Sequence, residues 1–458
     1  MIHKFRMNGC NFILDVNSLC VHIVDDLAYD LVDYLSEDRN FLSVLEDFKK
    51  KKNVFDEFEI EECFNEIYEL KRFGKLFSEF SDFSDANKVL PFKSMCLNVA
   101  HDCNLRCKYC FASDGNFGEE KMLMPFEVAK ASIDFLIKNS KNRYNLEVDF
   151  FGGEPLMNFE IVKKVVNYAR NIEEKYKKNF RFTITTNGML LDDEKIDFIN
   201  KEISNVVLSL DGRKFVNDNF RITSLVKGTY DRIVPLYKKL VDKRKNKDYY
   251  IRGTFTKKNL DFTNDILHIA SLGFRNISVE PVVSVGNLDY SITSDDVEKI
   301  CKEYEKLANI LLKAKNNKKI FTFFHFLVDI DAGPCAVKRM RGCGCGNEYF
   351  AVTPKGDIFP CHQFVGESVW KMGNVIDGSF NRKIKLMLSK VNINTKEDCK
   401  NCFAKFYCSG GCAANSWKYE GDIFKGHKIS CKLQKKRTEC AIMIQSFKKI
   451  KNSVFSLN

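Results

Sequence analysis

The sequence predicts an α/β protein that is built around an open parallel sheet. A small unit precedes the sheet and a cysteine-rich segment follows it. Two observations lead to this prediction. From Ser94 onward, strand-like runs alternate with helical patterns six times, as in parallel sheets covered by helices. The chain of 458 residues also contains 18 cysteines, most of which gather in two stretches.

Length and composition limit the class of protein. A chain of this length exceeds one ordinary core and predicts two to four domains. No run of about 18 apolar residues occurs, and the start lacks the apolar core and cleavage site of a signal peptide. We therefore expect a cytoplasmic protein without a membrane partner. In that compartment, many cysteines favour metal sites or catalysis over disulfides.

The charge pattern bears on partners. The net charge of +11 comes from 72 basic and 61 acidic residues that are mixed along the chain. No arginine-rich stripe with interleaved aromatic residues occurs, so we expect no nucleic-acid partner. An acidic peptide partner suits the charge well.

Residues 1–80 read as a unit of their own. Phe12–Val24 predicts two short strands around a turn at Asn17 and Ser18. Asp25 and Asp26 predict the cap of a following helix. Two more helical patterns begin at Phe41 and at Glu57, and a polar linker is expected at 78–87.

The central region predicts six strands, each followed by a helical pattern. The predicted strands are Met95–Ala100, Glu147–Phe151, Phe182–Thr186, Val206–Leu210, Tyr250–Phe255 and Asn276–Glu280. The clearest helical patterns are Phe126–Lys138, Ile161–Lys177 and Thr263–Leu272. Six strand–helix units, where a closed barrel has eight, indicate an open, partial barrel.

Three cysteines, Cys103, Cys107 and Cys110, follow the first predicted strand with the spacing C-x3-C-x2-C. In such folds the chemistry lies on loops at the carboxyl ends of strands. Structural zinc takes four protein ligands, and four-iron clusters usually take four cysteines. Three local thiols therefore indicate a cluster with one iron open to a small molecule. The alternative is a zinc loop whose fourth ligand lies elsewhere.

With Tyr109 before its third cysteine, this loop resembles the signature of radical S-adenosylmethionine (SAM) enzymes. The resemblance implies a partial (β/α)6 radical SAM barrel over 90–320 and a 4Fe–4S cluster whose open iron is chelated by SAM. Gly152, Gly153 and Glu154, at the end of the second predicted strand, are similar to the family's motif for the SAM amino group. By the same resemblance, Ser209 would face the SAM ribose, and Arg221 or Arg252 the SAM carboxylate.

The last third of the chain carries a second set of cysteines. The spacing C-x2-C-x5-C-x3-C, with one more cysteine downstream, is a strong metal-binding pattern that two zinc sites could also use. Its order resembles a SPASM domain, expected at 333–440, which holds two auxiliary 4Fe–4S clusters. The resemblance implies that the outer cluster is held by Cys399, Cys402, Cys408 and Cys431. It implies Cys361 and Cys412, plus one upstream cysteine, for the inner cluster.

The upstream ligand is Cys335, Cys343 or Cys345, and Cys343 is the first choice. The surrounding residues, from Gly333 to Gly366, are similar to the maturases of SCIFF peptides ("six cysteines in forty-five"). In that family the residue that matches Cys345 is often not cysteine. With three ligands, the inner cluster would keep one iron open for a substrate thiolate.

The N-terminal unit resembles the PqqD-like, winged-helix-type recognition element of RiPP enzymes, which modify ribosomally made peptides. Such elements bind a leader peptide by adding it to a sheet edge; simple packing on the enzyme is the alternative. The resemblance implies a thioether-forming maturase of the sactipeptide or ranthipeptide kind. It would link peptide cysteines to the α-carbons of threonines, with a flavodoxin or ferredoxin as electron donor. The alternatives are a sulfatase-maturase-like enzyme that forms formylglycine and a non-catalytic, zinc-stabilised binding module.

Overall fold

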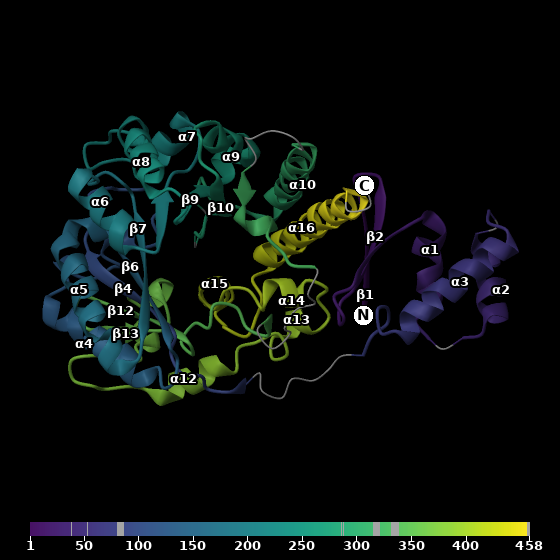
Figure 1. The fold of residues 1–458 in the computed structure, drawn as a ribbon, viewed down its shortest axis with the longest axis horizontal. Coiled ribbons are helices and arrows are strands. Elements are labelled where there is room, and N and C mark those ends of the chain that lie inside the picture. Colours follow the sequence, from purple (N-terminus) through teal and green to yellow (C-terminus); the bar gives the residue numbers. More distant parts are fainter. Residues whose placement is uncertain are drawn as a thin grey trace.

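The computed structural model describes residues 1–455 apart from 38, 53, 80–86, 285, 287, 315–320 and 331–338. Cys335 and most of the predicted linker at 78–87 therefore lie outside the described residues. Figure 1 shows a large sheet covered by helices, a region of short helices below it, and a small N-terminal unit beside α16 (Lys428–Phe455).

The N-terminal unit combines an antiparallel sheet with three helices. Its strands β1 (Ile2–Met7), β2 (Cys10–Asp15) and β3 (Val21–Val24) lie in the order β1-β2-β3. The helices are α1 (Asp26–Leu31), α2 (Phe41–Lys51) and α3 (Glu57–Arg72). The two predicted strands and three predicted helices are confirmed. β1 was not predicted, because its alternation of apolar and charged residues is irregular.

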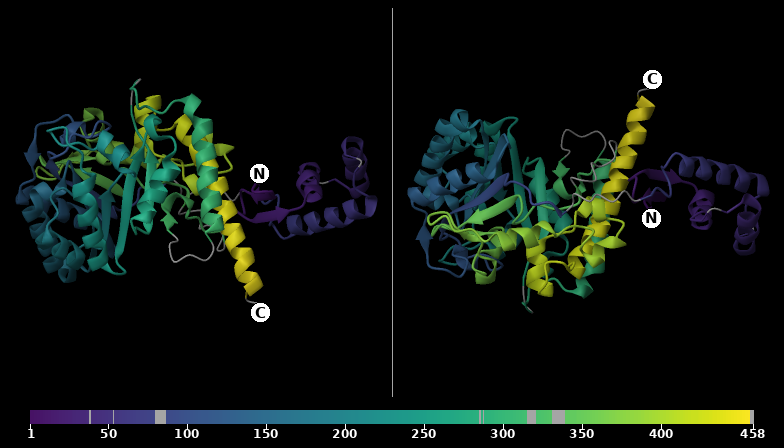
Figure 2. Two further views of the ribbon diagram at one scale, coloured as in Figure 1. Left: turned by 90° about the horizontal axis from the view of Figure 1, so that it is seen from above. Right: turned by 90° about the horizontal axis from the view of Figure 1, so that it is seen from below.

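The two faces of the N-terminal sheet pack into different hydrophobic cores. Ile13 packs with Leu31 and Phe48 in a core that belongs to the N-terminal unit. Phe12, on the other face, belongs to the main core. Strand side chains alternate between faces, which is why neighbours in one strand take part in two cores. Figure 2 shows that the helices α1–α3 project away from the rest of the molecule.

The central sheet has 11 strands, and its path runs β11-β10-β9-β8-β7-β6-β4-β12-β13-β14, with β5 beside β4. The strands from β11 to β12 along this path pair in parallel, and β5, β13 and β14 pair antiparallel. The six predicted strands are confirmed as β4 (Ser94–His101), β6 (Asn145–Gly152), β7 (Asn179–Thr186), β8 (Asn205–Ser209), β9 (Asp248–Phe255) and β10 (Asn276–Pro281). The others are β5 (Met122–Leu123), β11 (Thr322–Phe323), β12 (Tyr349–Val352), β13 (Asp357–Phe359) and β14 (Gly373–Asn374).

Helices cover the outer face of this sheet (Figure 1). They are α4 (Phe126–Asn139), α5 (Phe159–Tyr176), α6 (Asp193–Glu202), α7 (Lys214–Phe220), α8 (Tyr230–Arg244), α9 (Phe262–Ser271) and α10 (Val297–Lys313). Alternate strand residues such as Val148 and Phe150 are fully buried on the helix side. Asp149 and Phe151, between and after them, point to the inner side and stay partly exposed. The inner side is therefore free to line a cavity.

The cysteine-rich segment is joined to the same sheet. β12 lies parallel to β4, so the sheet continues past the position where a separate C-terminal domain was predicted. Short helices follow: α12 (Arg382–Ser389), α13 (Glu397–Lys400), α14 (Lys405–Cys408) and α15 (Ala413–Glu420). α16 then packs against α10 and the N-terminal sheet. No helix within the described ranges has the length and apolarity needed to cross a bilayer.

Because the N-terminal helices have their own core, a cavity there should unfold them selectively. Phe48 is fully buried, and we expect Phe48→Ala to lower the stability of this unit by about 3–5 kcal/mol. Leu42→Ala, on the same helix at a side chain that is 72% exposed, is the matched control. Amide hydrogen exchange should speed up in α1–α3 and stay unchanged in β4–β10. Equal acceleration in both regions would contradict the separate core.

Candidate active site

Inward-facing polar side chains of the parallel strands line a cavity of about 1040 Å³. The volume is at the upper end of the range for ligand pockets, about 300–1,000 Å³. From the strands and the turns after them come Asp149, Thr183, Thr185, Ser209, Arg252, Thr254 and Glu280. The predicted cysteine loop borders the same cavity, as do five cysteines of the C-terminal region. One chamber thus connects the two cysteine-rich stretches.

The loop after β4 brings Cys103, Cys107 and Cys110 to the cavity wall. The Cys110 amide donates to the Cys107 carbonyl at 3.0 Å, which turns the backbone sharply. Cys103 Sγ accepts a hydrogen bond from the Leu105 amide at 3.4 Å, and the Asn187 side-chain amide lies 3.6 Å away. Donors aimed at sulfur suit a thiolate, the form that binds metal. The three thiols therefore fit the predicted cluster.

Burial opposes thiolate formation here. It raises the pKa of Cys103 to about 12 and that of Cys107 to about 11, although the Arg221 guanidinium pulls the second value down. Thiols with such pKa values stay protonated at neutral pH unless a metal replaces the proton. Binding of the predicted cluster would supply the missing positive charge.

The two glycines after β6 let that strand end pack against the cysteine loop. A Cβ on Gly152 would lie 2.2 Å from the Ala100 carbonyl oxygen, and one on Gly153 would lie 2.1 Å from that of Asp102. The Gly153 amide donates to Ala100 at 2.8 Å, and the Glu154 amide donates to Asp102 at 3.0 Å. In the structure, both glycines leave room for the backbone of the loop that carries Cys103.

Glu154 is buried beside the cavity and is held by three donors. Its carboxylate accepts hydrogen bonds from the Leu156 amide at 3.0 Å, the Thr186 hydroxyl at 2.7 Å and the Asn187 amide at 2.8 Å. Burial raises its pKa to about 7, against the effect of these donors. An ammonium group nearby would favour the charged form. Glu154 thus fits the predicted contact with an amino group.

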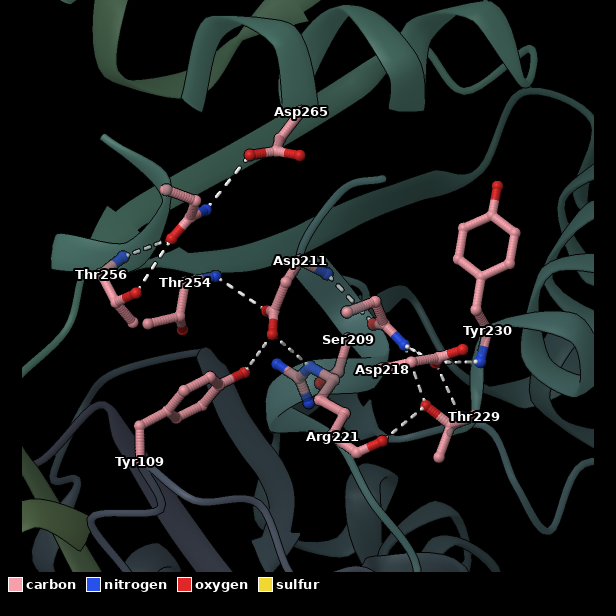
Figure 3. Close-up of polar contacts among 12 residues, drawn as sticks. Tyr109, Ser209, Asp211, Asp218, Arg221, Thr229, Tyr230, Thr254, Thr256 and Asp265 are labelled. Carbon is pink, nitrogen blue, oxygen red and sulfur yellow. Dashed lines mark hydrogen bonds and ion pairs between the residues drawn. The ribbon is translucent and has the colours of Figure 1, made fainter. Parts of the chain in front are cut away.

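Tyr109 anchors the cysteine loop to the next strands (Figure 3). Its hydroxyl donates to Asp211, which is fully buried after β8. Asp211 also accepts from the Thr254 amide at 2.9 Å and pairs with the Arg221 guanidinium at 3.1 Å. The role of Asp211 was not predicted, because it depends on partners that are distant in the sequence. The loop, β8 and β9 are thereby tied together.

Ser209 and Arg252 are neighbours across the β8–β9 pairing, and both line the cavity. Arg252 is exposed there, and its guanidinium makes no hydrogen bond or ion pair with another residue that the structure describes. Arg221, the other candidate for the SAM carboxylate, also lines the cavity, but it is 11% exposed and paired with Asp211. Of the two arginines, Arg252 is the one open to a ligand.

The C-terminal cysteines form two sets, which we call outer and inner. The outer set is Cys399, Cys402, Cys408 and Cys431, whose thiols act on one another electrostatically. The inner set is Cys343, Cys345, Cys361 and Cys412. The neighbouring Cys345 thiol lowers the pKa of Cys361. The predicted groups come together, and Cys345, which was not chosen from the sequence, lies with the inner one.

These sets do not have the geometry of single-ion sites. Among the described ranges, no group of three His, Cys, Asp or Glu side chains is placed to hold one metal ion. A zinc ion requires its sulfur ligands at about 2.3 Å. Four cysteine thiols in each set match the usual ligand set of a four-iron cluster.

Comparison with known proteins agrees with this chemistry. Residues 97–255 match the radical SAM superfamily, and residues 343–403 match the SPASM iron–sulfur cluster-binding domain. The radical SAM cyclopropyl synthase TigE of Paramaledivibacter caminithermalis is 25% identical over 446 residues, covering 90% of this chain and 88% of TigE. A cysteine-type anaerobic sulfatase-maturating enzyme of Clostridium novyi is 25% identical over 336 residues, covering 69% of this chain and 86% of that enzyme.

Two solved structures share the fold. The anSMEcpe structure with bound AdoMet and the Kp18Cys peptide has a TM-score of 0.64 at 21% identity, covering 79% of this chain and 100% of that one. Streptococcus suis SuiB bound to S-adenosylmethionine has a TM-score of 0.55 at 17% identity, covering 93% and 98%. The chain is a radical SAM enzyme with a radical SAM domain and a SPASM domain. Its cofactors are 4Fe–4S clusters and SAM.

Replacing Cys103, Cys107 and Cys110 together by alanine should abolish SAM cleavage. With dithionite as reductant, we expect 5′-deoxyadenosine to fall to the level without enzyme, and the iron content to fall by about four per chain. Cys301→Ala, on α10, is the control and should change neither value. Undiminished deoxyadenosine in the triple variant would contradict the assignment of this cluster.

Proposed function

We propose that the enzyme matures ribosomally made, cysteine-rich peptides by forming thioether links from peptide cysteines to the α-carbons of acceptor residues such as threonine. The observation that supports this most is the N-terminal unit, docked beside the cysteine-rich region. Matches that cover 90% and 93% of the chain, to TigE and SuiB, have to include part of residues 1–80. The sulfatase maturase match covers only 69%.

Different residues around the cavity would bind different groups of SAM. Cys103, Cys107 and Cys110 would hold the cluster that, with SAM bound, supplies a 5′-deoxyadenosyl radical for hydrogen abstraction from the substrate. Glu154 would accept a hydrogen bond from the SAM ammonium, and Ser209 one from the ribose. We assign the SAM carboxylate to Arg252 and give Arg221 the supporting role, because Arg221 is already paired with Asp211.

The two C-terminal sets would hold the auxiliary clusters. With Cys345 beside Cys343, Cys361 and Cys412, the inner set offers four thiols. Four thiolates complete the usual ligand set of a four-iron cluster, so we infer an inner cluster that is closed to a substrate thiolate. This replaces the open iron expected from three ligands. The cysteines of the two sets would thus hold clusters that supply a site for the surplus electron, and a flavodoxin or ferredoxin would be the electron donor for SAM cleavage.

The N-terminal unit is proposed as a winged-helix-like recognition element for the leader of the substrate peptide, and the parallel sheet as a partial barrel around the reaction. β3 ends the three-stranded sheet, and no further described strand pairs with its outer edge. The opposite edge strand, β1, meets the cysteine-rich region: the His3 ring stacks on Phe403 at 3.4 Å between ring centroids. β3 is therefore the edge available for an added strand.

A second candidate is the conversion of a peptide cysteine to formylglycine. The resemblance to cysteine-type sulfatase-maturating enzymes over most of the SAM and SPASM domains favours it. The two products are distinguished by the fate of sulfur. A thioether keeps the cysteine sulfur in the peptide, whereas formylglycine replaces it with oxygen.

The decisive experiment uses a short cysteine-rich peptide encoded beside this enzyme's own reading frame. The reconstituted enzyme is incubated anaerobically with that peptide, SAM and dithionite, and the peptide is analysed by mass spectrometry. We expect the loss of two hydrogen atoms per link and of one alkylatable thiol. Loss of sulfur would establish the formylglycine reaction. If the enzyme cleaves SAM but the peptide mass does not change, this peptide is not the substrate.

A substitution on β3 tests the recognition element more sharply than deletion, because deletion would also remove Phe12 from the main core. Ile23, on β3, is 36% exposed. We expect Ile23→Lys to weaken binding of the leader about tenfold, which is about 1.4 kcal/mol. Leu42→Lys on the exposed side of α2 is the control. Both should cleave SAM normally without peptide, and unchanged affinity in Ile23→Lys would favour a packing role.

A further inference from the structure

Lys396 is buried between the inner and outer cysteine sets, with only 1% of the residue exposed. It caps the start of α13, the helix that carries Cys399. A buried ammonium is costly unless it is hydrogen-bonded and paired with opposite charge. The residues around Lys396 supply both the hydrogen-bond acceptors and the negative charge.

The Lys396 ammonium joins three segments of the chain. Its Nζ donates to Ser416 Oγ at 2.9 Å, and the Ser416 hydroxyl in turn donates to the carbonyl of Cys412 at 3.1 Å. It also donates to the carbonyl of Lys425 at 3.3 Å, in the loop that leads to Cys431. Lys396 therefore contacts the segments that carry members of both cysteine sets.

The charge of Lys396 acts on both sets as well. It interacts electrostatically with Cys399, Cys408 and Cys431 of the outer set and with Cys412 of the inner set. Burial lowers the pKa of Lys396, and negative charge on these cysteines, which are thiolates when they bind metal, acts in the opposite direction and favours the ammonium.

Two other lysines act on one set each. Lys405 interacts with Cys399 and Cys402, in the outer set. Lys418 interacts with Cys361 and Cys412, in the inner set. Lys405 and Lys418 are therefore controls for a cation that interacts with both cysteine sets.

We propose that Lys396 is a shared cation of the two auxiliary clusters and that its ammonium raises the reduction potential of both. Reduction adds negative charge to a cluster, and a fixed cation nearby stabilises that charge. Net charge and hydrogen bonding around the cluster are the means by which a protein tunes such potentials. A higher potential makes both clusters better acceptors for an electron that leaves the reaction chamber.

The test is a redox titration followed by electron paramagnetic resonance, carried out on the reconstituted full-length enzyme. The variant that lacks Cys103, Cys107 and Cys110 is titrated in parallel to identify the auxiliary signals. We expect Lys396→Met to shift both auxiliary midpoints to more negative values. A tenfold change in the reduced-to-oxidised ratio corresponds to about 59 mV for one electron. Lys405→Met should shift the outer midpoint alone, and Lys418→Met the inner one alone.

The outcomes separate a charge effect from a merely structural one. Unchanged auxiliary midpoints in Lys396→Met, or a shift in only one of them, would overturn the proposal. If Lys396→Met loses auxiliary iron, Lys396→Arg decides. Full iron with both midpoints close to wild type supports a required charge, and any other result overturns it. The measurement needs no peptide, so its result is independent of the proposed substrate.

Discussion

The site depends on the packing of one loop against the ends of the parallel strands. The loop that carries Cys103, Cys107 and Cys110 packs Ala112 and Phe117 into the main core, and backbone contacts join it to the strand ends. Gly152 and Gly153 allow β6 to approach it, and paired amides and carbonyls join the two. A side chain at either glycine would push the strand end away from the loop. Three thiols are thereby kept on one wall of the cavity.

The polar contacts behind the loop extend this constraint across the sheet. Tyr109 reaches Asp211, and Asp211 also holds Arg221 and the backbone of β9 (Figure 3). A buried carboxylate without such partners would be strongly destabilising. The ion pair with Arg221 therefore satisfies Asp211, and the hydrogen bond from Tyr109 ties the cysteine loop to the turn after β8. This leaves Arg252, one strand further on, open to the chamber.

The cysteine-rich region is an extension of the same framework. Its first strand, β12, lies beside β4, and its last helix, α16, packs on α10 and on the N-terminal sheet. Both cysteine sets are thus joined to the framework that carries the loop with Cys103, Cys107 and Cys110. The N-terminal unit contributes one sheet face to this framework, and its helices form a core of their own. Such a division suits a domain that binds a partner while the chamber stays intact.

The sequence by itself predicted the six long strands of the central sheet and the iron–sulfur and SAM cofactors. Alternation in runs such as Val148–Phe150 defines strands, and close spacing defines cysteine loops, because both are local properties of the chain. Only the tertiary structure shows that Arg221 pairs with Asp211, that Cys345 lies near Cys361, and that Lys396 is buried near both cysteine sets. These features depend on contacts between segments that are distant in sequence, for which spacing along the chain provides no measure.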